Sequence, residues 1–133
     1  MVDLVPSGTG GALASGAYYE PTLVADVAQN SEIVQDEVFG PVLVVLPFDS
    51  DDEGLALAND TPYGLAASAW SRDVMRCMRA SREIQAGCVW INDHIPIVSE
   101  MPHGGFKQSG YGKDMSLYAI EHYTELKHVM VKH

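Results

Sequence analysis

The 133-residue sequence contains few basic residues and few cysteines. The first shortage limits the kinds of partner that we expect, and the second limits the cellular compartment. It contains 8 Lys and Arg residues against 18 Asp and Glu residues, which gives a formal net charge of −10. Contacts with nucleic-acid phosphates need clustered basic side chains, so we expect no nucleic-acid partner. Cys77 and Cys88 are too few for a disulfide framework, and this favours a reducing, cytoplasmic compartment.

Long apolar runs and leader-like segments are also lacking. The longest apolar run covers residues 42–48 and is far below the roughly 20 residues of a membrane-spanning helix. The first 16 residues have no basic segment followed by an apolar core, so we expect neither a signal peptide nor a membrane partner. The five histidines lack the close spacing on one element that metal sites prefer, so we expect no metal.

The order of the segments that remain indicates an α/β fold. Residues 1–19 are rich in Gly, Ser and Ala and read as an irregular lead-in, while 20–133 form one domain. We expect strands within 20–27, 42–48, 65–70, 88–92 and 126–131, with helices after residues 50, 71 and 114–116. The Val-rich run at 42–48 is typical of a strand buried on both faces. Strands that alternate with crossover helices imply a mostly parallel sheet.

Local signals place several helix ends. Ser50 and Glu53 form a capping box, in which each side chain can bond a backbone N–H of the first turn. Pro62 ends that helix, because the residue before a proline avoids helical angles. Ser71 is the expected cap of the second helix, and Gly87 is its expected stop.

The most informative local pattern is the turn Glu37–Pro41, directly before the apolar run. The Glu37 carboxylate can accept hydrogen bonds from two neighbouring hydroxyls, and Phe39 can offer an apolar face to a ring. A ribose that carries nicotinamide has both features. The residues before Glu37 include no cysteine and no glycine-rich phosphate loop, so this turn looks like part of a site.

Several separated motifs agree, in order, with one enzyme superfamily. They are EPT at 20–22, EVFGPV at 37–42, ANDTPYGL at 58–65, AGCVWIN at 86–92, PHGGFKQSG at 102–110 and YTELK at 123–127. With these motifs the chain resembles the C-terminal portion of the NAD(P)-dependent aldehyde dehydrogenases. Segments 98–105 and 109–115 resemble those of the aminobutyraldehyde and betaine aldehyde dehydrogenases in particular.

The resemblance implies a fold and an activity. The fold would be the C-terminal part of the aldehyde dehydrogenase catalytic domain, with a terminal strand that takes part in assembling a homo-oligomer. The activity would be oxidation of an aldehyde, with 4-aminobutyraldehyde as a candidate, to the acid by NAD or NADP. The family's nucleophilic Cys, general-base Glu, oxyanion Asn and cofactor domain lie upstream of the position of Glu37. We therefore expect no catalytic residue here, and an inactive chain on its own with weak or no cofactor binding.

The resemblance also implies cofactor contacts and a substrate pocket. Glu37 would bind the nicotinamide-ribose hydroxyls and Phe39 would pack beside the nicotinamide. The aldehyde pocket would be lined from the stretch 92–103, by Asn92, Ile95, Ile97, Glu100 and His103. Many relatives have Phe at the position of His103, so a more polar pocket, suited to an amino-substituted aldehyde, is expected here.

Plainer interpretations stay open beside these roles. Glu37 could be a solvated loop acid and His103 a surface histidine. Cys77 and Cys88 are expected to be small core residues rather than reactive thiols. The glycines between 104 and 112 are expected to shape backbone turns, since the third glycine of a dinucleotide loop would fall at Met115. The alternative function is a non-catalytic oligomerisation or binding protein that reuses this piece of fold.

Overall fold

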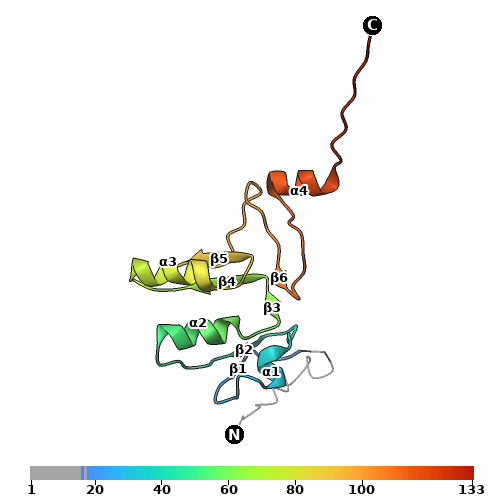
Figure 1. The fold of residues 1–133 in the computed structure, drawn as a ribbon. Coiled ribbons are helices and arrows are strands. Elements are labelled where there is room, and N and C mark those ends of the chain that lie inside the picture. Colours follow the sequence, from blue (N-terminus) through green and yellow to red (C-terminus); the bar gives the residue numbers. More distant parts are fainter. Residues whose placement is uncertain (1–15, 17) are drawn as a thin grey trace. The chain divides into compact units, whose positions relative to one another are not determined.

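The structure is a computed structural model that describes Gly16 and residues 18–133 (Figure 1). The chain divides into two compact units, one ending at Asp60 and the other spanning Thr61–His133. The irregular lead-in expected over residues 1–19 lies outside the described residues, apart from Gly16, Tyr18 and Tyr19. The domain boundary at residue 20 stays a prediction.

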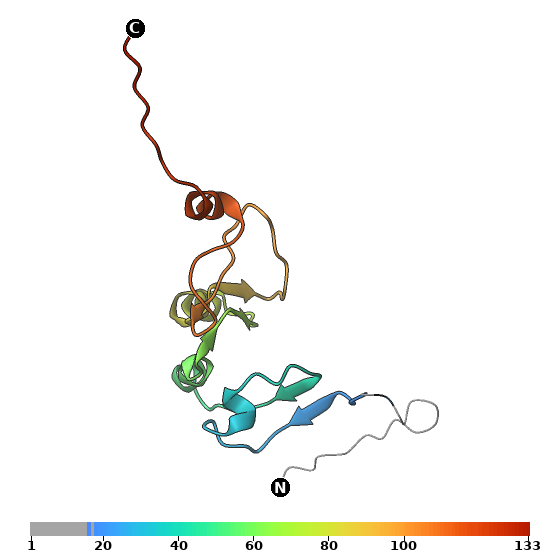
Figure 2. The same ribbon diagram turned by 90° about the vertical axis from the view of Figure 1, so that its right-hand side faces the viewer.

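The first unit contains a parallel pair of strands, β1 (Thr22–Val24) and β2 (Val42–Val44), with the short helix α1 (Glu32–Gln35) in the connection between them (Figure 2). One face of the pair is buried at Val24, whose side chain is 3% exposed. On the opposite face, the register partners Leu23 and Leu43 are 67% and 61% exposed. The prediction of a strand over 42–48 buried on both faces is therefore wrong, because no element in the described part of this unit covers that second face.

Helix α2 (Asp51–Asn59) begins where the capping box predicts. The Glu53 backbone N–H donates to Ser50 Oγ over 3.2 Å. The Glu53 carboxylate accepts from the backbone N–H of Asp49 over 2.8 Å, one residue earlier than the usual partner. The helix ends at Asn59, as the Pro62 signal predicts.

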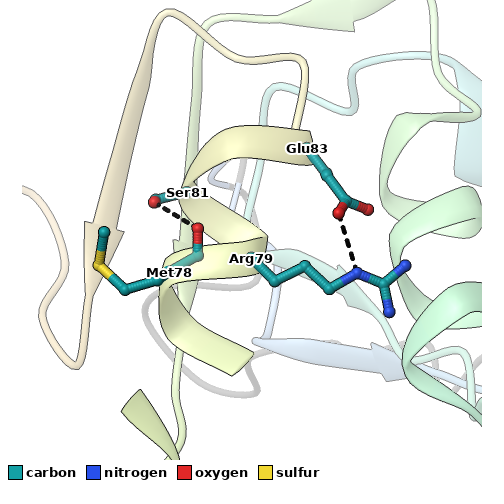
Figure 3. Close-up of polar contacts among 4 residues, drawn as sticks. All are labelled: Met78, Arg79, Ser81 and Glu83. Atoms are coloured by element: carbon teal, nitrogen blue, oxygen red, sulfur yellow. Dashed lines mark hydrogen bonds and ion pairs between the residues drawn. The ribbon is translucent and has the colours of Figure 1, made fainter. Parts of the chain in front are cut away.

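The second unit is built on another parallel pair, β4 (Ala66–Ala69) and β5 (Cys88–Ile91), joined by the crossover helix α3 (Val74–Glu83). Cys77 is the buried residue of α3 and is 3% exposed, as expected of a core thiol. Near the end of the helix, Arg79 Nε pairs with Glu83 Oε1 over 2.9 Å, and Ser81 Oγ donates to the Met78 carbonyl (Figure 3).

The start of α3 differs from the prediction. Asp73 rather than Ser71 is the N-cap, because its carboxylate accepts from the N–H groups of Met75 and Arg76 over 2.8 and 3.3 Å. Ser71 Oγ instead accepts from the Asp73 N–H over 3.0 Å. The helix also ends at Glu83, four residues before the predicted stop at Gly87.

Two remote segments meet in the short antiparallel pair β3 (Tyr63–Gly64) and β6 (Phe106–Lys107). β3 lies just before the strand expected over 65–70, which forms as β4. Backbone approaches are very close around this pair. A Cβ atom on Gly87 would lie 1.6 Å from the Gly104 carbonyl oxygen, and one on Gly64 would lie 2.4 Å from that of Gln85. The glycines therefore allow main chain to pack on main chain.

Helix α4 (Ser116–Tyr123) follows, and residues 124–133 run on without helix or strand (Figure 1). The strand predicted over 126–131 does not form, and Leu126 is fully exposed. A strand needs a hydrogen-bonding edge beside it, and the described part of the chain gives this segment none. The fold is thus mixed α/β, with two parallel pairs and one antiparallel pair of strands in place of one mostly parallel sheet.

Candidate functional site

The turn Glu37–Pro41 connects α1 to β2 and displays its side chains. Two tight hydrogen bonds shape it, from the Gly40 N–H to the Val38 carbonyl over 2.6 Å and from the Val42 N–H to the Gly40 carbonyl over 2.8 Å. Glu37 is exposed, and Phe39 is 97% exposed. The turn therefore presents a carboxylate and an aromatic ring two residues apart, with neither used in packing.

The start of this turn is held by hydrogen bonds to the end of α2. The side-chain amide of Gln35 donates to the Asp60 carbonyl over 2.9 Å and to the Gln29 carbonyl over 2.7 Å. Gln29 Nε2 also donates to the Asp60 carbonyl over 2.7 Å. These bonds fix the chain two residues before Glu37, so the position of the carboxylate does not depend on α1 alone.

An open, largely apolar hollow of about 700 Å³ lies beside the turn. Its lining includes Phe39, Pro41, Tyr19, Val24 and Ile33. Glu37 is not among the residues that line it. Phe39 thus reaches both solvent and an apolar surface on which a flat ring could lie, whereas Glu37 stands outside the hollow, facing water.

Asn92 directly follows β5, and its backbone N–H and side-chain amide are bonded to β4 and the segment after it. Its backbone N–H donates to the Ala69 carbonyl over 2.9 Å. Its side-chain Oδ1 accepts from the Ser71 N–H, and Nδ2 donates to the Ser71 carbonyl, both over 2.9 Å. The same carbonyl accepts from Cys77 Sγ over 3.6 Å. In this conformation Asn92 holds Ser71 rather than offering its amide to a ligand.

The loop after Asn92 is held by residues that sequence reasoning missed. Ser68 Oγ and His94 Nδ1 are 2.6 Å apart, and Trp90 Nε1 donates to the Pro96 carbonyl over 2.9 Å. The rings of Trp90 and His94 meet edge to face with centroids 5.5 Å apart. Alternation along two parallel strands predicts which side chains share a face, but only the strand register shows that Ser68 and Trp90 are neighbours.

The remaining predicted pocket residues lie further along the same loop. Ile95 and Ile97 are 62% and 49% exposed. Glu100 is exposed in a turn closed by a hydrogen bond from the Met101 N–H to the Val98 carbonyl over 3.2 Å. The Ser116 N–H donates to the Ser99 carbonyl over 2.8 Å and ties this turn to the start of α4.

His103 stands apart from these residues. It is half-buried, and its backbone forms a two-bond antiparallel bridge with Asp114 over 3.0 and 2.8 Å. It lines a hollow of about 480 Å³ together with Lys113, His122 and glycines of 104–112. The other four predicted pocket residues do not line this hollow. The structure therefore places Asn92, Ile95, Ile97 and Glu100 along one exposed loop and His103 at the base of that loop.

Comparison with known proteins settles the family. Residues 3–129 match the family model described as "Aldehyde dehydrogenase family". The chain belongs to that family. The prediction made from the motifs is confirmed, and mixed α/β structure with parallel strand pairs agrees with it.

Curated relatives include betaine aldehyde dehydrogenases. The chain is 48% identical over 117 residues to that of Bacillus subtilis (strain 168), which covers 88% of this chain and 24% of the relative. It is 44% identical over 117 residues to the chloroplastic enzyme of Beta vulgaris, covering 88% of this chain and 23% of the relative. The chain thus spans about a quarter of the length of the curated relatives it matches.

Solved structures give the same family. A betaine aldehyde dehydrogenase of Staphylococcus aureus in complex with NAD⁺ superposes with a TM-score of 0.79 at 41% identity, covering 81% of this chain and 21% of that one. An indole-3-acetaldehyde dehydrogenase mutant of P. syringae in complex with NAD⁺ and IAA has a TM-score of 0.79 at 48% identity, with 83% and 22% covered.

Two features are absent from the described residues. No helix there has the length and apolar character needed to span a membrane. Within the same residues, no three His, Cys, Asp or Glu side chains gather in a way that could hold a metal ion.

Proposed function

We propose that this chain supplies the C-terminal part of an NAD(P)-dependent aldehyde dehydrogenase that oxidises a small aldehyde to the corresponding acid. The observation that carries the proposal is the family match over residues 3–129 of a chain that covers about a quarter of its relatives. The described part of the chain buries few apolar side chains, with Val24 and Cys77 as its buried hydrophobic residues. Such a surface suits a chain that is covered by the rest of an enzyme.

The turn Glu37–Pro41 is the proposed contact with the cofactor. A carboxylate can accept hydrogen bonds from both ribose hydroxyls, and bonds to a charged acceptor are the stronger kind. Glu37 is exposed, and Phe39 is exposed beside an apolar hollow of about 700 Å³, so both are free to take these roles. Glu37 and Phe39 would orient the nicotinamide half of NAD(P), which would supply the hydride acceptor for aldehyde oxidation.

The loop 92–103 is the proposed wall of the aldehyde pocket. Ile95 and Ile97 would give it apolar contacts, and Glu100 and His103 would give it polar ones. A carboxylate near the pocket favours an aldehyde that carries a cationic amino group, as 4-aminobutyraldehyde and betaine aldehyde do. Asn92 would act by holding the loop to Ser71, since its amide is already bonded there.

The same proposal includes assembly and location. The exposed segment 124–133, with apolar Leu126, Val129 and Val131, is suited to pair with an edge strand of a second copy in a cytoplasmic homo-oligomer. The chain by itself is proposed to be inactive, because no residue in it is assigned as nucleophile or general base. It would bind NAD weakly or not at all without the phosphate-binding part of the enzyme.

The test compares the purified chain with a chimera in which residues 20–133 replace the matching segment of the Bacillus subtilis relative. We expect no NADH from the chain and clear NADH from the chimera with betaine aldehyde or 4-aminobutyraldehyde. In the chimera, Glu37→Gln should raise the KM for NAD by roughly tenfold or more, since a charge-assisted hydrogen bond contributes about 1.5–3 kcal/mol.

The matched control is Asp36→Asn, which removes the same charge one residue away. It should leave the KM for NAD within about twofold, because exposed charges that make no direct contact contribute little. Turnover by the chain alone would contradict the proposed inactivity. Equal effects of Glu37→Gln and Asp36→Asn would show that Glu37 acts through general charge and holds no ribose.

A further inference from the structure

The loop that follows β5 has an unfavourable backbone conformation at its centre. Ile95 has a φ of +79°, and Asn92 has a φ of +53°. Asn tolerates the left-handed region, but a β-branched residue there is a clear outlier. Such a conformation persists only where neighbouring contacts over-determine it, so the contacts around Ile95 must compensate for its cost.

Those contacts come from both neighbours of Ile95. His94, on one side, lies 2.6 Å from Ser68 Oγ through its Nδ1 atom and meets the Trp90 ring edge to face. Pro96, on the other side, accepts a hydrogen bond from Trp90 Nε1 over 2.9 Å. The residues before and after the strained position are therefore both fixed to β4 and β5.

The strand register makes this arrangement possible. Ser68 and Trp90 are direct partners in the parallel pair β4–β5, so their side chains leave the same face side by side. Ser68 is also the one polar residue in β4, whose other residues are Ala66, Ala67 and Ala69. A hydroxyl in this strand is not required by packing, and its contact is with the loop.

We propose that Ser68, Trp90 and His94 are positioning residues, which hold residues 93–97 in the conformation that directs Ile95 and Ile97 into the aldehyde pocket. This inference rests on the proposed function, because it takes the loop as the pocket wall. None of the three residues has to touch the aldehyde. Each acts through the backbone of the loop, and through it sets the shape available to the substrate.

The conformational part is tested in the chain itself by NMR. The hydrogen-exchange rate of the Trp90 indole N–H reports opening of its bond to Pro96, and the indole of Trp70, 68% exposed, is an internal reference. Ser68→Ala should speed exchange at Trp90 about fivefold, the effect of one neutral hydrogen bond, and leave Trp70 unchanged. Ser68→Thr keeps a hydroxyl and should restore most of the protection.

Two further variants separate this from a general loss of stability. Ser81→Ala is the matched control, because Ser81 Oγ bonds a backbone carbonyl within α3 (Figure 3), and it should leave Trp90 exchange unchanged. His94→Phe keeps an aromatic ring but removes Nδ1. If Ser68 and His94 act through one bond, the double variant should exchange no faster than either single variant.

The link to the pocket is tested in the chimera. Ser68→Ala should raise the KM for the aldehyde several-fold and leave both kcat and the KM for NAD within about twofold, the pattern of lost substrate binding. Unchanged exchange at Trp90, or faster exchange with an unchanged aldehyde KM, would overturn the inference. A parent chimera that oxidises no aldehyde would instead refute the proposed function, and the exchange result would still show whether these contacts hold the loop.

Discussion

Replacing Asn92 should lower the free energy of unfolding of the second unit. The structure divides this loss into a hydrogen-bond contribution and a backbone contribution. Its side chain makes two hydrogen bonds with the Ser71 backbone, both of 2.9 Å, at an exposed site. Each contributes roughly 0.5–1 kcal/mol. Asn92 also has a φ of +53°, a region that costs alanine roughly 1–2 kcal/mol. Asn92→Ala should therefore lower the free energy of unfolding by about 2–4 kcal/mol.

Two other substitutions at this position separate the terms. Asn92→Gly loses both hydrogen bonds but accepts the left-handed backbone, so its cost should be smaller, about 1–2 kcal/mol. Asn92→Asp keeps the acceptor for the Ser71 N–H and tolerates the backbone, and it should cost about 1 kcal/mol. Urea unfolding of the full chain, followed by circular dichroism at equal m-values, measures all three.

The expected order of destabilisation is Ala, then Gly, then Asp. A cost below about 0.5 kcal/mol for Asn92→Ala would show that the Ser71 bonds are replaced by water without loss. An aspartate variant as unstable as the alanine variant would show that the donor bond to the Ser71 carbonyl carries the whole effect. Either result would refute the division made here and return Asn92 to the set of residues free to bind a ligand.

Two further predictions concern backbone packing and capping. Gly87→Ala places a Cβ 1.6 Å from the Gly104 carbonyl oxygen and should lower the free energy of unfolding by about 3 kcal/mol or prevent folding. Gly40→Ala is the control, because a Cβ there meets no atom within 4 Å, and it should lower that free energy by less than about 1 kcal/mol. The same urea assay measures both. Similar stability of the two variants would contradict the close approach. Ser50→Ala should lower the free energy of unfolding by about 1 kcal/mol and reduce the helical circular dichroism signal, because it removes the acceptor of the Glu53 N–H. An unchanged stability and signal would show that water caps α2 equally well.

Local signals in the sequence predicted local structure well. The capping box at Ser50 and Glu53 gave the start of α2, and the apolar face of the second helix gave Cys77 as a core residue. Both depend on residues within one or two turns of each other. The cap of α3 was placed two residues early because Ser71 and Asp73 are both good caps, and the carboxylate, which accepts two N–H groups, is the one used.

Features that depend on remote partners were predicted less well. The run 42–48 has the composition of a doubly buried strand, but Leu43 is exposed because none of the described residues of its unit covers that face. Segment 126–131 has strand composition, but among residues 18–133 it finds no strand edge to pair with. Amino-acid composition predicts which surfaces become buried. It does not show whether the element that covers them belongs to the same chain.

The candidate site shows the same limit. The sequence motifs predicted that Glu37, Phe39 and residues of the stretch 92–103 belong to the site. Their roles stay predictions. The pairing of Ser68 with Trp90, and the contact of both with the loop, could not be read from the sequence because it depends on strand register. The family resemblance grouped His103 with Asn92 in one pocket wall, yet His103 lines a separate hollow at the base of the loop.

The close approach of Gly87 and Gly104 has a consequence for how the loop between β5 and β6 could vary. At one end, the loop 93–103 follows Asn92, which is bonded to the Ser71 and Ala69 backbone. At the other, it ends where main chain rests on main chain, with no side chain between. Both attachments are independent of the identity of the loop residues. The segment between them can therefore vary in sequence, and even in length, between two fixed attachments. Under the proposed function, new aldehyde specificity could arise there without disturbing the fold.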